Sequence, residues 1–257
     1  MTVSSNTLDF FYRKLLNIAL LATSSFCASV YANPVALDGL LDLRDWSFAQ
    51  QGTTTLSGEW DFYWNTLPDD LSIARVDSLN TIYKIPVPSY WNDLKINGVK
   101  LPEDGYGAYR LNILVSGNEE LALKMLSIGT AYTLFIDGVE LLSVGKLGRN
   151  KESSLPDYAP QIITFTPKSN RVEILIAVSN FHYRNAGLWE IIRIGRGVDL
   201  RTERESQLAG DLLLFGAILM MAIYNLCMWA ARREFTFGLY LGCFCLLLGV
   251  RILLVDE

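Results

Sequence analysis

Two long stretches near the C-terminal end carry almost no charge, and they constrain the fold more than any other feature. Residues 212–231 contain no Asp, Glu, Lys or Arg, and residues 236–255 contain only Arg251. About 20 apolar residues in a helix cross the core of a bilayer, and a helix pairs its own backbone amides there. The sequence therefore predicts two transmembrane helices, at 208–231 and 236–255, in a lipid bilayer. A helical hairpin buried in a soluble domain is the alternative, but a hydrophobic content of 51% favours lipid.

The short loop between these helices predicts their orientation. Residues 232–235 include Arg232 and Arg233, and short loops rich in Lys or Arg face the cytoplasm. Both outer ends of the hairpin should then face the periplasm of a bacterium, with the protein in the inner membrane. Gly238 and Gly242 form a GxxxG pair, which we interpret as ordinary helix packing in preference to a dedicated dimer motif.

The N-terminal segment predicts a secretion signal. Arg13 and Lys14 precede an apolar stretch that ends near Phe26, and Val30-Tyr31-Ala32 then offers small or tolerated residues at a leader peptidase site. We expect residues 1–32 to be a cleaved signal peptide. An uncleaved anchor is the alternative, but the apolar run is short for a membrane span.

The region between the signal and the helices predicts a mainly β fold. Val172, Ile174, Ile176 and Val178 alternate along one strand, and Asp137-Gly138 between two apolar runs is a strong hairpin signal. Strands are expected at 60–64, 82–87, 109–115, 121–128, 131–136, 139–144, 162–166, 171–179 and 189–194. Short strands with Gly and Pro between them predict a jelly-roll β-sandwich over residues 33–200, followed by a connector at 201–207.

Several function classes find no support in the composition. The net charge is -5 without a run of basic residues, so no nucleic-acid partner is expected. His182 is the only histidine, and the cysteines lie in the leader and in the apolar stretches, so neither a metal site nor a cofactor nor a disulfide framework is expected. Nucleophile-elbow, zinc-protease and phosphate-loop motifs are missing from the sequence, so we predict no catalytic residues and no enzyme.

The ordered motifs of the middle region resemble a known family. They are Gly58-Glu59-Trp60-Asp61-Phe62-Tyr63-Trp64, Val87-Pro88-Ser89-Tyr90-Trp91, Tyr106-Gly107-Ala108-Tyr109-Arg110, Asp137-Gly138, Val178-Ser179-Asn180 and Gly187-Leu188-Trp189. They resemble the type 2 extracellular domain of bacterial seven-transmembrane receptors with diverse intracellular signalling modules (7TMR-DISM). That domain is similar to the galactose-binding-like sandwich of family 2 glycoside hydrolases. The resemblance covers residues 37–200, and the two predicted membrane helices match the start of the family's membrane unit.

The resemblance implies a periplasmic sensor of carbohydrate-like ligands that belongs to a membrane signalling receptor. The sequence ends after the second predicted helix, so we expect a sensory part without its own output domain. It could be a truncated form of a longer receptor, or a subunit that lends its domain to other receptor subunits. A membrane-anchored sandwich that binds a partner protein in an assembly or structural role is the alternative function.

Two predicted loops, at 88–106 and 180–189, offer residues suited to a carbohydrate or another small periplasmic ligand. A sugar site needs aromatic faces and a few converging polar groups. For each Trp a core position is favoured over ligand contact, a surface or hydrogen-bonded role is favoured for His182, and Arg184 is the best polar candidate. The candidate ligand-binding residues are Trp91, Asn92, Asp93, Tyr106, His182, Arg184 and Trp189.

Overall fold

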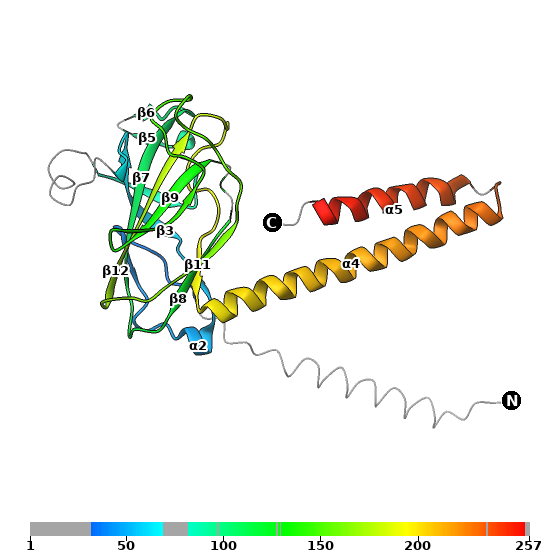
Figure 1. The fold of residues 1–257 in the computed structure, drawn as a ribbon, viewed down its shortest axis with the longest axis horizontal. Coiled ribbons are helices and arrows are strands. Elements are labelled where there is room, and N and C mark those ends of the chain that lie inside the picture. The colour runs from blue at the N-terminus through cyan, green and yellow to red at the C-terminus, as the bar shows by residue number, and fades with distance from the viewer. Residues whose placement is uncertain are drawn as a thin grey trace, which may run out of the picture. The chain divides into compact units, whose positions relative to one another are not determined.

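The computed structural model describes residues 32–68, 82–96, 98–126, 128, 130–234 and 236–254. The predicted signal peptide therefore lies outside the described residues, except for Ala32. The described chain is mainly β and is followed by two long apolar helices (Figure 1). The predicted fold class is confirmed.

Two sheets face each other and a small hairpin lies beside them. The larger sheet has the strand order β10-β9-β12-β7-β3-β4, and β1 pairs with β7 in parallel. Its strands are β1 (Leu40–Asp42), β3 (Gly58–Trp64), β4 (Tyr83–Val87), β7 (Gly105–Leu114), β9 (Ala131–Ile136), β10 (Val139–Val144) and β12 (Arg171–Asn180). The smaller sheet, in the order β11-β8-β13-β2, contains β2 (Thr54–Thr55), β8 (Leu121–Met125), β11 (Gln161–Phe165) and β13 (Arg193–Gly195). The hairpin consists of β5 (Lys95–Ile96) and β6 (Val99–Lys100).

The hydrophobic core lies between the two sheets. Val172, Ile174, Ile176 and Val178 of β12 are buried in it, as their alternation predicts. The smaller sheet contributes the inward-facing residues of β8 from the other side, among them Leu123. The protein is therefore a β-sandwich whose faces are set by the two-residue period of its strands.

The Asp137-Gly138 hairpin forms where the sequence predicts it. Val139 pairs with Ile136 across the turn, and both turn residues have positive φ, 50° at Asp137 and 75° at Gly138. Such φ values match the twist of the flanking strands, and Asp and Gly tolerate them best. Asp137 also accepts a hydrogen bond from the Glu173 amide at 2.9 Å, which ties the hairpin to β12.

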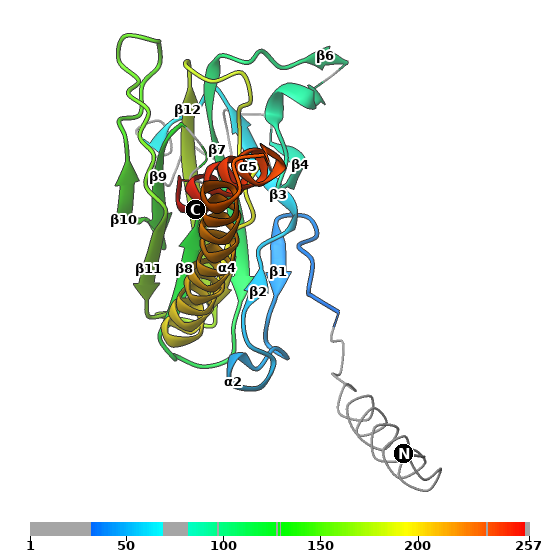
Figure 2. The same cartoon turned by 90° about the vertical axis from the view of Figure 1, so that its right-hand side faces the viewer.

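The sandwich has two distinct ends. Both views place the β5–β6 hairpin at one end and the short helix α2 (Phe48–Gln51) at the other (Figures 1 and 2). The 3-10 turn η2 (Trp91–Asp93) leads into β5, and so belongs to the first end. We call these the loop end and the helix end, because α4 starts close to α2.

Helices α4 (Gly197–Ala231) and α5 (Thr236–Leu254) are long and apolar enough to cross a membrane by length and composition. The 19 residues of α5 rise about 28 Å, close to a bilayer core. The residues predicted as a connector, 201–207, lie within α4, so one continuous helix leaves the sandwich and enters the apolar segment.

Small residues bring the two helices together. A Cβ added at Gly242 would lie 2.7 Å from Cγ of Leu226, and one at Gly249 would lie 3.3 Å from the Phe215 ring. Gly242 of the GxxxG pair thus packs within the hairpin, and Gly238 is buried as well. Large apolar side chains point away from the contact, and Leu247, for example, is 70% exposed. Lipid is the solvent that such a surface suits.

Candidate functional site

Two loops meet at the loop end and, together with Ile128 and Tyr158, border an open cavity of about 550 Å³. One loop connects β4 to β7 and the other connects β12 to β13. The volume is within the usual range for small-molecule sites. The cavity is lined by Asn92, Asp93, Lys100, Glu103, Ile128, Tyr158, Tyr183, Arg184, Asn185 and Trp189.

Backbone hydrogen bonds join the two loops side by side. The Ser89 amide donates to the Leu188 carbonyl and the Trp91 amide donates to the Ala186 carbonyl, both at 2.8 Å. Gly187 permits this approach, since it has a φ of 112° and a Cβ there would lie 2.9 Å from the Trp91 amide nitrogen. The residues around Trp91 and Trp189 therefore form one structural unit although they are far apart in sequence.

Two buried asparagines lock the loops further. Asn92 donates to the Arg184 carbonyl and accepts from the Ala186 amide, each at 3.2 Å. Asn180 donates to the carbonyls of Glu103 and Tyr183, at 3.0 and 2.6 Å, and accepts from the Tyr183 amide at 3.1 Å. Buried amides with all these partners position the backbone. Asn180 thus satisfies polar groups of the loop backbone.

Tyr109 supports the same loop from below. Its hydroxyl accepts a hydrogen bond from the Leu188 amide at 3.3 Å, and its ring is fully buried. Burial raises the pKa of the Tyr109 hydroxyl well above its usual range, and the Leu188 amide opposes this only in part. The phenol stays neutral and acts as a fixed support for the loop.

Trp189 and Arg184 provide the aromatic and cationic groups of the cavity. The Trp189 indole donates to the Ile128 carbonyl at 3.1 Å and lies against Tyr90, with ring centroids 5.9 Å apart. The indole is thereby fixed while part of it stays accessible. Arg184 is exposed, and its guanidinium has no hydrogen bond or ion pair with any residue that the structure describes. A cation without a partner at a cavity wall is free to bind a ligand.

The remaining charges at the cavity are solvated. Asp93 and Lys100 form a long ion pair of 3.8 Å, and both side chains are more than half exposed. Such a pair contributes little to stability because water screens it. Glu103 is also exposed. The cavity thus presents two carboxylates, two cations and three aromatic rings.

The structure brings four of the seven predicted site residues together and places three elsewhere. Asn92, Asp93, Arg184 and Trp189 line the cavity. Trp91 does not line the cavity, because its ring is fully buried and packs in the core against Trp64. Its indole N–H donates a hydrogen bond to the Pro102 carbonyl.

The other two predicted residues outside the cavity hold the neighbouring loop. Tyr106 lies under the guanidinium of Arg149, 5.8 Å from the ring centroid. His182 is exposed and bonds through Nε2 to the Ser154 carbonyl at 3.0 Å, the hydrogen-bonded role that the sequence favours. Both contacts tie residues 149–154 to the sandwich, which leaves neither side chain at the cavity wall.

Six of the ten lining residues are not among the candidates, namely Lys100, Glu103, Ile128, Tyr158, Tyr183 and Asn185. The two predicted loops offer Glu103, Tyr183 and Asn185, whereas the sequence gives no such indication for the other three. Lys100 belongs to β6, which is too short to give a periodic signal, and Ile128 follows a strand whose end the sequence misplaces. Tyr158 comes from a third loop, between β10 and β11. An exposed Tyr beside Pro160 in a polar stretch was the available signal for Tyr158.

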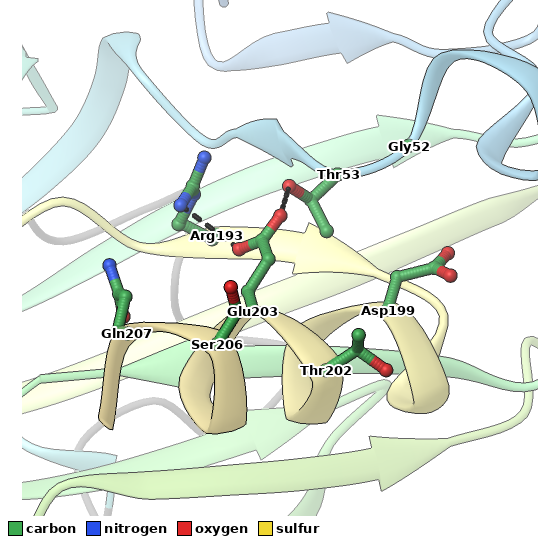
Figure 3. A pocket seen from close by; sticks show the side chains of 8 residues that line it. All are labelled: Gly52, Thr53, Arg193, Asp199, Thr202, Glu203, Ser206 and Gln207. Atoms are coloured by element: carbon green, nitrogen blue, oxygen red, sulfur yellow. Dashed lines mark hydrogen bonds and ion pairs between the residues drawn. The ribbon is translucent and has the colours of Figure 1, made fainter. Parts of the chain in front are cut away.

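A second cavity, of about 560 Å³, lies at the helix end between α4 and the smaller sheet (Figure 3). It is lined by Gly52, Thr53, Arg193, Asp199, Thr202, Glu203, Ser206 and Gln207. Apart from Gly52, the lining residues all have polar or charged side chains, and none of them is aromatic. Among the described residues, no group of three His, Cys, Asp or Glu could hold a metal ion.

Comparison with known proteins gives only distant structural matches. No family model matches the chain, and no curated protein matches it in sequence. A family 2 glycoside hydrolase β-galacturonidase from Eisenbergiella tayi bound to galacturonate aligns with 12% identity and a TM-score of 0.40, over 56% of this chain and 24% of the enzyme. A β-glucuronidase from Ruminococcus gnavus aligns with 15% identity and a TM-score of 0.42, over 55% of this chain and 28% of the enzyme. The alignment therefore spans about a quarter of each enzyme, and similarity this low carries no conclusion about activity or ligand.

Proposed function

We propose that this chain is the ligand-binding and membrane-anchoring part of a bacterial signalling receptor. The sandwich faces the periplasm, α4 and α5 cross the inner membrane, and the cavity at the loop end binds a carbohydrate or a carbohydrate-like molecule. Ligand binding shifts the sandwich relative to the membrane helices, and further receptor subunits receive that shift.

The convergence of two distant loops on one aromatic and polar cavity carries this proposal. Trp189, Tyr183 and Tyr158 offer rings on which the C–H face of a sugar can lie. Arg184, Asn185 and Glu103 offer donors and acceptors for hydroxyl groups. The fixed asparagine and backbone bonds beneath them supply a preformed wall, so little ordering cost falls on binding.

We also propose that the chain is not an enzyme. The cavity carboxylates Asp93 and Glu103 are both solvent-exposed, and Asp93 lies beside Lys100. A general acid in a glycosidase needs a shielded setting that raises its pKa. If the purified chain hydrolysed glycosides, and if Asp93→Asn with Glu103→Gln abolished that activity, this part of the proposal would be wrong.

Thermal unfolding of the full chain in detergent tests ligand binding. Sugars and cell-wall fragments are screened, and a ligand at 100 times its Kd should stabilise the native state by about 2.7 kcal/mol. Arg184→Ala and Tyr183→Ala should remove the shift, whereas Arg201→Ala, an exposed arginine on α4 away from the cavity, should retain it. A broad screen without any shift, or a shift that both cavity variants retain, would contradict the proposal.

A further inference from the structure

The first turns of α4 lie on the outer face of the smaller sheet. Ala122 and Lys124 alternate with the core residues of β8, so they face away from the core, yet they are 0% and 8% exposed. A Cβ at Gly197 of α4 would lie 3.8 Å from Cβ of Ala122, and Leu200 of α4 is fully buried. The start of α4 is therefore docked on the sheet and covers it.

One carboxylate holds this docked segment to two neighbouring strands. Glu203 accepts a hydrogen bond from the Thr53 hydroxyl at 2.7 Å and from Nη1 of Arg193 at 3.0 Å (Figure 3). Thr53 precedes β2, and Arg193 is the first residue of β13. These two strands pair with each other. Both oxygens of Glu203 are used, one for each strand.

The contact is of a kind that can open. The Arg193 and Glu203 side chains are 40% and 35% exposed, and they border the cavity at the helix end. Partly solvated ion pairs add little net stability, because water competes for both charges. Around Leu200 the docked segment carries mostly polar side chains, so its release would expose little apolar surface.

The strands under α4 also reach the ligand cavity. Trp189, which lines the cavity, stands four residues before Arg193 on the same chain segment. Its indole bonds to Ile128, which follows β8, and Arg193 pairs with Lys124 of β8. The two strands beneath α4 thus run from the loop end, where the ligand cavity lies, to the helix end.

We propose that Glu203, Thr53 and Arg193 form a releasable latch that docks α4 on β13 and β2, and that a displacement at the Trp189 end of β13 changes how often it opens. The latch stands on its own contacts, whereas the link to the cavity rests on the proposed function. An open latch frees the first three turns of α4 to move relative to the sandwich while the helix stays continuous into its apolar part.

Hydrogen–deuterium exchange of the full chain in detergent tests the latch. Glu203→Gln and Arg193→Gln should each speed exchange of the amides at 198–207 by roughly three- to tenfold, as expected for loss of a partly exposed charged contact. Glu205→Gln is the matched control, because Glu205 is exposed on the same helix and no described residue pairs with it. Exchange in β12 should stay unchanged, which shows that the fold is intact. If Glu203→Gln matches Glu205→Gln, the latch is wrong.

A second arm tests the link to the cavity without a ligand. Asn185→Cys, at the cavity wall, is modified with a bulky thiol reagent, and the unsubstituted chain treated alike corrects for its own cysteines. The adduct should change exchange at 198–207 by more than twofold, and Glu203→Gln should abolish the difference. No change would overturn the link. Because no ligand is used, this result is independent of whether any sugar binds.

Discussion

Removing the Asn180 side chain should destabilise the sandwich through the loss of its hydrogen bonds to the loop backbone. Asn180 is 1% exposed and makes three hydrogen bonds to the backbone of Glu103 and Tyr183. Each such bond contributes about 1 kcal/mol net, and Asn180→Ala leaves the Glu103 and Tyr183 carbonyls without this donor. We expect a loss of about 3 kcal/mol in the free energy of unfolding.

Urea unfolding of the full chain in detergent, followed by tryptophan fluorescence, measures this loss. Asn185→Ala is the matched control, because Asn185 is exposed and has no hydrogen bond with a described residue; its effect should stay within about 0.5 kcal/mol. If Asn180→Ala cost less than about 1 kcal/mol, the two loops would not depend on this residue, and the preformed wall of the cavity would lose its physical basis.

Two further predictions concern the helices and the core. Gly242→Leu should loosen the α4–α5 contact and cost about 1–3 kcal/mol by overpacking against Leu226; Gly216→Leu, where a Cβ meets nothing within 4 Å, should not, as thermal unfolding in detergent can check. Burial raises the pKa of Tyr132 to about 12, and no described residue bonds to its hydroxyl. The folded state therefore keeps this proton longer than the unfolded state, so stability is lost as pH rises from about 10 to about 12. In Tyr132→Phe that loss should shrink, and a pH series of unfolding curves that matches the parent would contradict the assignment.

Sequence patterns predict the regular parts of this fold well. The alternation in β12 and the Asp137-Gly138 turn are local signals, and each is set by neighbours within a few residues. β1 went unpredicted, since it is three residues long and pairs in parallel with β7, about 70 residues further along the chain. Such a pairing depends on tertiary contacts that leave no periodic signal.

The candidate site was predictable only in part for the same reason. Residue type alone cannot separate Trp91, which is sealed in the core, from Trp189, which lines the cavity. Both lie in loops that backbone hydrogen bonds join, yet the Trp91 ring is part of the buried core and the Trp189 ring is only partly buried beside it. Tyr158 enters from a third loop, whose position depends on the whole sandwich.

The orientation of the hairpin in a membrane is the claim on which the periplasmic assignment depends. A membrane-impermeant maleimide is added to intact spheroplasts that contain one of two variants, Glu119→Cys on the sandwich or Glu234→Cys between α4 and α5. The extent of labelling is then measured on the peptide that contains the introduced cysteine. We predict rapid labelling at residue 119, and labelling at residue 234 only after the membrane is broken. Labelling of residue 234 in intact spheroplasts, or recovery of the protein in the soluble fraction without detergent, would contradict the account.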